Sequence, residues 1–144
     1  MTKRIRIVLD GSVECEAALF EDKAPRTVAS LWRALPIEDR TIQVRWSGNA
    51  WRTDGNYELL PKDAPVENVA DRLAAGDVIY YPGYHSGLIK IGMAYGGAKW
   101  YAPFARELDV ALIGKIDEGL EAFTKRCENI ILEGPLSVRM SRIE

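Results

Sequence analysis

The sequence is poor in the residues that build metal centres and disulfide frameworks. It holds one histidine, His85, and two cysteines, Cys15 and Cys127, among 144 residues. A typical zinc site takes about four Cys or His ligands at short spacings, and no CxxC pair is present. We therefore expect no metal and no cofactor. The two cysteines lie in apolar stretches, which favours buried, reduced thiols, although pairing between them stays open.

Long apolar runs and an excess of one charge are missing too. The chain has 19 basic and 21 acidic side chains, a net charge of −2 and a pI near 5.5. Nucleic-acid surfaces are strongly basic, so we expect no nucleic-acid partner. The first apolar run, residues 5–9, is short and contains Arg6, and no stretch approaches the roughly 20 apolar residues of a membrane span. We expect a cytoplasmic protein without membrane contact.

What the chain does contain is a series of short β-type segments separated by Gly and Pro turns. We expect strands over residues 3–10, 13–20, 41–46, 50–53, 78–81, 88–95, 110–116, 129–132 and 136–143. Strands so numerous and so closely spaced favour a barrel over a doubly wound sheet. The length fits a single domain over residues 1–144. Residues 54–75 show no regular pattern, and whether they cover a site as a lid stays open.

Two segments have the pattern of a strand, a turn and an amphipathic helix. Pro25 suits the first turn of a helix, because its φ is fixed and it has no N–H. One apolar stripe follows it, made of Val28, Leu31, Trp32 and Leu35. A second stripe falls within residues 118–127, made of Leu120, Phe123 and Cys127. We therefore predict a mainly β fold, a closed barrel with a helix over each open end.

These two segments resemble the signatures of the cyclophilin family. Residues 19–28 read LFEDKAPRTV, and residues 113–120 read IGKIDEGL. Both lie in the family's order, and the resemblance spans nearly all of the chain. It is strongest to divergent bacterial and archaeal cyclophilin-like proteins of unassigned function. The resemblance implies a closed cyclophilin-like β-barrel of about eight strands capped by two α-helices.

The resemblance also implies prolyl cis–trans isomerisation, but it supplies little of the machinery. Cyclophilins present an Arg from a central strand, and Arg45, in the strand expected over residues 44–52, is the best match. Most of the other residues that the family uses are replaced; Val110 stands where the family has its His. An exposed charge on a strand explains Arg45 equally well. We assign no catalytic residue, and isomerase is the one enzyme class that the resemblance leaves open.

Aromatic residues gather near these positions, mostly at strand ends and in loops: Trp46, Trp51, Tyr57, Tyr80, Tyr81, Tyr84, Tyr95, Trp100, Tyr101 and Phe104. Tyr and Trp favour pockets and interfaces. If the cyclophilin register holds, Arg45, Trp51, Tyr81 and Tyr95 approach one concave face, joined by Arg52. Such a site suits a small molecule or peptide bearing a carboxylate or planar amide. Filling of the barrel ends and a dimer contact is the alternative.

His85 completes the set of binding candidates. It lies in a turn, and no nucleophile beyond its neighbour Ser86 accompanies it, so a catalytic pair is not indicated. It contacts ligand or is a solvent-exposed loop residue. Three functions remain: a binding module without isomerase activity, a peptidyl-prolyl isomerase with a rebuilt site, and a structural protein whose aromatics form a homo-oligomer interface.

Overall fold

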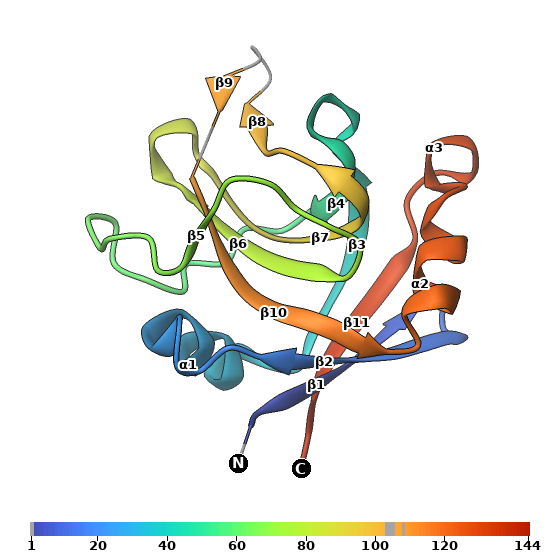
Figure 1. The fold of residues 1–144 in the computed structure, drawn as a ribbon, viewed down its shortest axis with the longest axis horizontal. Coiled ribbons are helices and arrows are strands. Elements are labelled where there is room, and N and C mark those ends of the chain that lie inside the picture. Colours follow the sequence, from blue (N-terminus) through green and yellow to red (C-terminus); the bar gives the residue numbers. More distant parts are fainter. Residues whose placement is uncertain (1, 103–105, 108) are drawn as a thin grey trace.

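The protein is a closed antiparallel β-barrel (Figure 1). The computed structural model describes residues 2–102, 106–107 and 109–144. The barrel strands are β1 (Arg4–Leu9), β2 (Val13–Leu19), β3 (Ile37–Gln43), β4 (Gly48–Thr53), β6 (Asp77–Gly83), β7 (Leu88–Ala98), β10 (Val110–Glu118) and β11 (Ser137–Ile143). Their order is β2-β1-β11-β3-β4-β7-β6-β10, and β10 pairs with β2 to close the ring. The predicted mainly β, eight-stranded barrel is confirmed.

The remaining strands are short. β5 (Val69–Ala70) pairs with the start of β10, and β8 (Tyr101–Ala102) pairs with β9 (Arg106–Glu107). Residues 66–73, for which the sequence allows a short helical piece or a tucked loop, contain this bridge and no helix.

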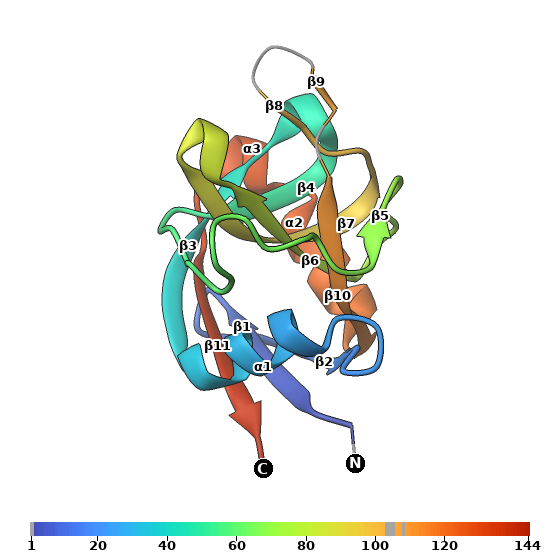
Figure 2. The ribbon, with the colours of Figure 1, turned by 90° about the vertical axis from the view of Figure 1, so that its left-hand side faces the viewer.

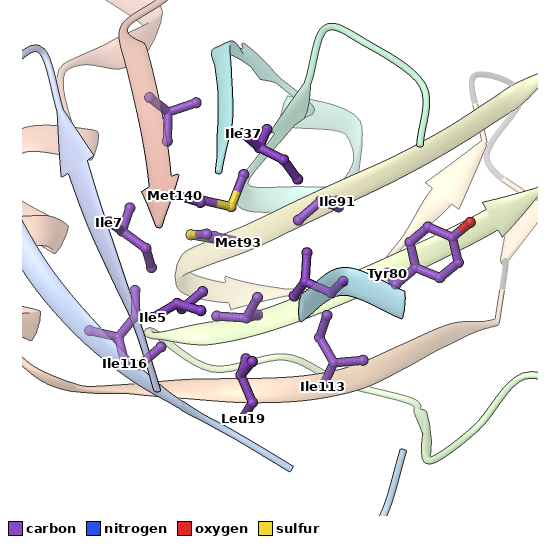
Figure 3. Packing of buried hydrophobic residues seen from close by; sticks show 14 of the residues in the cluster. Ile5, Ile7, Leu19, Ile37, Tyr80, Ile91, Met93, Ile113, Ile116 and Met140 are labelled. Carbon is purple, nitrogen blue, oxygen red and sulfur yellow. The ribbon is translucent and has the colours of Figure 1, made fainter. Parts of the chain in front are cut away.

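Apolar side chains that alternate along the strands fill the barrel. In β1, Ile5, Ile7 and Leu9 are fully buried, while the residues between them are partly exposed. Figure 3 shows the same interior receiving Met93 from β7 and Met140 from β11. Each fully buried side chain of this kind contributes about 1.5–3 kcal/mol, so the interior supplies most of the stability of the barrel.

Two helices pack against this core as predicted. α1 (Pro25–Ala34) begins at its proline and buries Val28 and Leu31. α2 (Leu120–Cys127) contributes Phe123 and Cys127 to the same cluster. Burial raises the pKa of the Cys127 and Cys15 thiols to about 12, and both cysteines are free.

The expected strand over residues 129–132 is wrong, because this segment forms the short helix α3 (Ile130–Glu133). The segment over residues 129–132 is too short for its apolar residues to show a helical or a strand period, so its sequence does not distinguish a helix from a strand. Only Ile130 of this helix is buried, while Ile131 and Leu132 are 52% and 87% exposed.

The strand expected around Arg45 is also wrong in detail. β3 ends at Gln43, and Arg45 begins the 3-10 turn η1 (Arg45–Ser47), after which β4 starts. β6, in contrast, continues through Pro82, where the sequence predicts its end. Pro82 is tolerated because it lies next to the last residue of the strand, where one N–H fewer costs little pairing.

The irregular segment after β4 is fastened to the barrel rather than projecting from it. Tyr80 Oη donates to the Tyr57 carbonyl oxygen at 2.7 Å and accepts from the Leu59 N–H at 3.0 Å. Leu59 and Leu60 are buried in the main core. Figures 1 and 2 both show this green segment directly above α1. Residues 57–60 are therefore part of the packing at this end of the barrel.

Candidate functional site

Arg45 lies beside a groove between β3 and α3. The groove has a volume of about 340 Å³ and is lined by Ile42, Gln43, Arg45, Ile130, Ile131, Gly134 and Pro135. Figures 1 and 2 place α3 and the turn after β3 at the same end of the molecule. Most of the lining is apolar, and the polar groups are confined to Gln43 and Arg45. Mostly apolar pockets with a few convergent polar groups are typical ligand sites.

The guanidinium of Arg45 has no carboxylate partner among the residues that the structure describes. Its Nη1 donates to Asn49 Oδ1 at 3.0 Å, and the side chain is exposed. A guanidinium carries five N–H donors, so most of its hydrogen-bonding capacity remains for a ligand.

The backbone turn that carries Arg45 is held in place on both sides. Val44, just before it, is buried. Trp46 Nε1 donates to the Tyr101 carbonyl oxygen at 2.9 Å, and the Tyr101 N–H donates to Ser47 Oγ at 2.8 Å. The position of Arg45 is thus fixed by contacts with a segment more than fifty residues away, which the local sequence does not reveal.

Gln43 is oriented by a buried tyrosine. Tyr95 Oη donates to Gln43 Oε1 at 2.9 Å, and Gln43 Nε2 donates to the Gly48 carbonyl oxygen at 3.3 Å. Burial raises the pKa of Tyr95, which keeps its hydroxyl protonated as the donor. One amide hydrogen of Gln43 remains beyond these bonds. Tyr95 therefore acts on the groove through Gln43.

The structure does not bring Trp51 and Tyr81 to the groove with Arg45. Trp51 is fully buried in the main core, 6.4 Å from the ring of Phe123. Tyr81 belongs to a separate apolar cluster, where its ring lies 6.4 Å from that of Trp100. The predicted common concave face is therefore not formed. Trp51 and Tyr95 belong to the main core, whereas Tyr81 belongs to the second cluster on the other face of the sheet.

Arg52 lies one strand away from the groove and faces a different polar cluster. It pairs in register with Ile42, but its Nη1 donates to the Thr53 carbonyl oxygen at 2.9 Å. Burial lowers the pKa of Arg52. Burial also lowers the pKa of Lys90, and repulsion by the like charge of Arg52 lowers it further. Lys90 Nζ donates to the Asp54 carbonyl oxygen at 2.5 Å.

The structure does not describe the side chains of two predicted candidates, His85 and Phe104. His85 lies in the 3-10 turn η2 (Tyr84–Ser86), but its side chain is outside the described part of the structure. Phe104 lies outside the described residues altogether. Within the described ranges, no three His, Cys, Asp or Glu side chains gather as metal ligands would.

Sequence reasoning missed the groove residues Ile42 and Gln43 of β3, and it missed those of α3 and the turn after it, where a strand was predicted. A signal was present: Asn129 precedes the apolar run, and Gly134 follows it. Asn is a favoured N-cap residue and Gly commonly follows a helix end. In the structure, Asn129 is the N-cap and Gly134, with φ of 86°, is the C-cap.

Solved structures with this architecture include proteins of diverse kinds. The hypothetical protein AF2241 from Archaeoglobus fulgidus is 26% identical, with a TM-score of 0.61 over 99% of this chain and 95% of that one. McbB, solved in complex with tryptophan, has 18% identity and a TM-score of 0.71, covering 96% of this chain. This chain spans 44% of McbB. The mimivirus cyclophilin has 13% identity and a TM-score of 0.57, with 98% and 87% coverage.

Other comparisons concern the sequence itself. No curated protein matches it. Among the described residues, no helix combines the length and the apolar character needed to cross a membrane. The family described as "Protein of unknown function (DUF3830)" matches residues 7–142. The chain therefore belongs to this family of unknown function and has the cyclophilin-like fold that its sequence predicts.

Proposed function

We propose that this protein is a cytoplasmic binding module, without prolyl isomerase activity, whose ligand is a small amphipathic carboxylate held in the Arg45 groove. One observation carries the proposal: a guanidinium without an ion pair among the described residues stands at the edge of a mostly apolar groove. Arginine binds carboxylates through two parallel N–H···O bonds, which gives orientation as well as energy.

The groove has an apolar part and a polar part, and each matches one part of the proposed ligand. Ile42, Ile131 and Pro135 offer apolar surface to a hydrocarbon or aromatic body, whose burial stabilises the complex by about 25 cal/mol per Å². Arg45 and the remaining N–H of Gln43 meet the carboxylate. The McbB structure contains tryptophan, a small amphipathic carboxylate. That precedent on a related architecture supports the proposed ligand class.

The absence of isomerase activity is proposed because no aromatic side chain of the described residues lines the groove beside Arg45. Trp51 and Tyr81, two of the aromatic residues expected near Arg45, are packed inside the protein instead. On an X-Pro peptide we expect no acceleration over the uncatalysed rate with wild type or with Arg45→Ala. Activity in the wild type that is lost in the variant would restore the isomerase.

Calorimetric titration tests the binding site directly. Indole-3-propionate and indole-3-propanol have the same apolar body and differ in the carboxylate. We expect the acid to bind and the alcohol to bind at least tenfold more weakly. Arg45→Gln should weaken binding of the acid by about 10- to 100-fold, the range for hydrogen bonds between charged groups.

Arg72→Gln is the matched control, because Arg72 is exposed, carries the same charge and does not line the groove. It should leave the affinity unchanged. Equal affinities for acid and alcohol, or equal losses in both variants, would exclude Arg45 as the carboxylate-binding group.

A further inference from the structure

A second groove lies between α1 and the segment after β4. Figures 1 and 2 show α1 well apart from α3, which lines the Arg45 groove. The volume of the second groove is about 470 Å³, within the range of ligand sites. The helix side presents Arg26, Ser30 and Arg33. The other side is made of Leu59, Leu60 and Pro61.

The helix side is a single stripe of α1. Arg26, Ser30 and Arg33 stand at i, i+4 and i+7, so their side chains share one face. A helix rises about 1.5 Å per residue, which separates the two arginines by about 10 Å along the axis. Two cations therefore flank the groove at a fixed spacing.

Neither guanidinium is in an ion pair within the described part of the chain. Arg33 Nη2 donates to Ser30 Oγ at 3.0 Å, and both arginines are exposed. Glu67 lies beside the start of this stripe and is engaged by α1 itself, and the positive charge of Arg26 contributes to lowering the pKa of its carboxyl. Its Oε1 accepts from the Thr27 N–H and from Thr27 Oγ1, both at 2.8 Å, and its Oε2 accepts from the Arg26 N–H at 3.3 Å.

The opposite wall is preformed. The Leu59 N–H donates to Tyr80 Oη at 3.0 Å, and Tyr84 Oη donates to the Leu60 carbonyl oxygen. The side chains of Leu59 and Leu60 are buried, so this wall is anchored in the barrel core. A ligand entering the groove does not have to order the wall, which lowers the entropic cost of binding.

We propose that this groove binds an extended acidic peptide segment, with one carboxylate at Arg26 and another at Arg33. An extended chain advances about 3.3 Å per residue and its side chains alternate between two faces, so acidic side chains two or four positions apart share one face and span the two arginines within the reach of their long side chains. An apolar residue between them packs against Pro61. Charge complementarity and the spacing of the two arginines along α1 select this occupant.

Fluorescence anisotropy with the full chain tests this proposal. The probe is a fluorescein-labelled peptide, Glu-Gly-Leu-Gly-Glu, with an amidated end, and its Gln-for-Glu analogue is the reference without side-chain carboxylates. We expect the acidic peptide to bind and the analogue to lose most of the affinity. Arg26→Gln and Arg33→Gln should each weaken binding about three- to fivefold, and the double variant by about 10-fold or more.

The double variant Arg72→Gln/Lys125→Gln is the control, because it changes the net charge equally at exposed positions outside the groove. It should keep wild-type affinity, as should Arg45→Gln, which separates this site from the first groove. Equal losses in the two double variants would overturn the proposal in favour of nonspecific charge attraction. Binding of suberate, a free dicarboxylate, without binding of the peptide would overturn the peptide assignment.

Discussion

At the scale of single residues, the direction of a side chain decides its role, and neighbouring residues have opposite directions. Tyr80 faces the main core and bonds to the segment after β4, whereas Tyr81 packs against Trp100 outside it. The sequence identifies both as aromatic but cannot assign their faces. β6 is buried on both sides, so it shows no alternation of polar and apolar residues. For this reason the predicted set of binding aromatics combined residues that face the main core with residues that face away from it.

Asp39 is the residue whose charge contributes most visibly to local structure. It accepts hydrogen bonds from Tyr57 Oη and from the N–H groups of Arg40, Asp54 and Gly55. Burial raises the pKa of Asp39, but these hydrogen bonds outweigh it, and the pKa lies below its ordinary value. A carboxyl with a lowered folded-state pKa stabilises the protein above its unfolded pKa, near 3.9, and loses that contribution as the pH falls further.

We therefore predict that Asp39→Asn destabilises the protein by about 1–3 kcal/mol at neutral pH, since a partly buried acceptor of several hydrogen bonds is impaired. The difference from wild type should shrink as the pH falls below about 4. Urea unfolding at pH 7 and pH 3 measures both effects. Tyr57→Phe, which removes one donor and keeps the charge, is the control and should retain most of the pH dependence. A constant difference at both pH values would contradict the assignment.

At the scale of elements, strands and long helices were predictable, and the short connections were not. α1 follows from Pro25 and its apolar stripe, and the helix begins at that proline as expected. η1 and α3 are a single turn or little more, too short for a period to appear. These two elements and the turn after α3 supply all residues of the Arg45 groove except Ile42 and Gln43 of β3. The candidate site was therefore less predictable than the barrel that supports it.

The start of α1 depends on a residue outside the helix. Its N-cap position is Ala24, which has no side-chain hydrogen bond to offer, and Glu67 supplies the acceptor from the distant segment. A carboxylate at a helix N-terminus also meets the positive end of the helix dipole. The pKa of Glu67 is lowered because hydrogen bonds from Thr27 and Arg26 outweigh the raising effect of burial.

We predict that Glu67→Ala destabilises the protein by about 1 kcal/mol and increases amide exchange at Thr27. Glu67→Gln keeps an acceptor oxygen and loses only the charge, so about half of the effect or less should remain. Urea unfolding and hydrogen exchange of the three proteins measure this. Unchanged exchange at Thr27 in the alanine variant would show that Glu67 does not cap α1.

At the scale of the whole molecule, the pairing of β10 with β2 turns an open sheet into a barrel. An open sheet would expose two edge strands, and closure removes them. Gly114 lies at this seam, paired with Leu19 of β2 on one side and Val78 of β6 on the other. A Cβ at this position would lie 2.9 Å from the Ala18 carbonyl oxygen and 3.1 Å from Leu19 Cδ2. The seam closes because the residue there has no side chain.

We predict that Gly114→Ala destabilises the protein by about 1–3 kcal/mol, since the added methyl group forces backbone atoms apart at the seam. Gly97→Ala is the matched control, because a Cβ at Gly97 meets no atom within 4 Å, and its effect should stay within about 0.5 kcal/mol. Hydrogen exchange should rise along both β2 and β10 in Gly114→Ala, because each strand loses its partner when the seam opens. A rise confined to β10 would mean that the barrel does not depend on closure. In that case each side of the seam would be held by its other neighbour alone, β1 for β2 and β6 for β10.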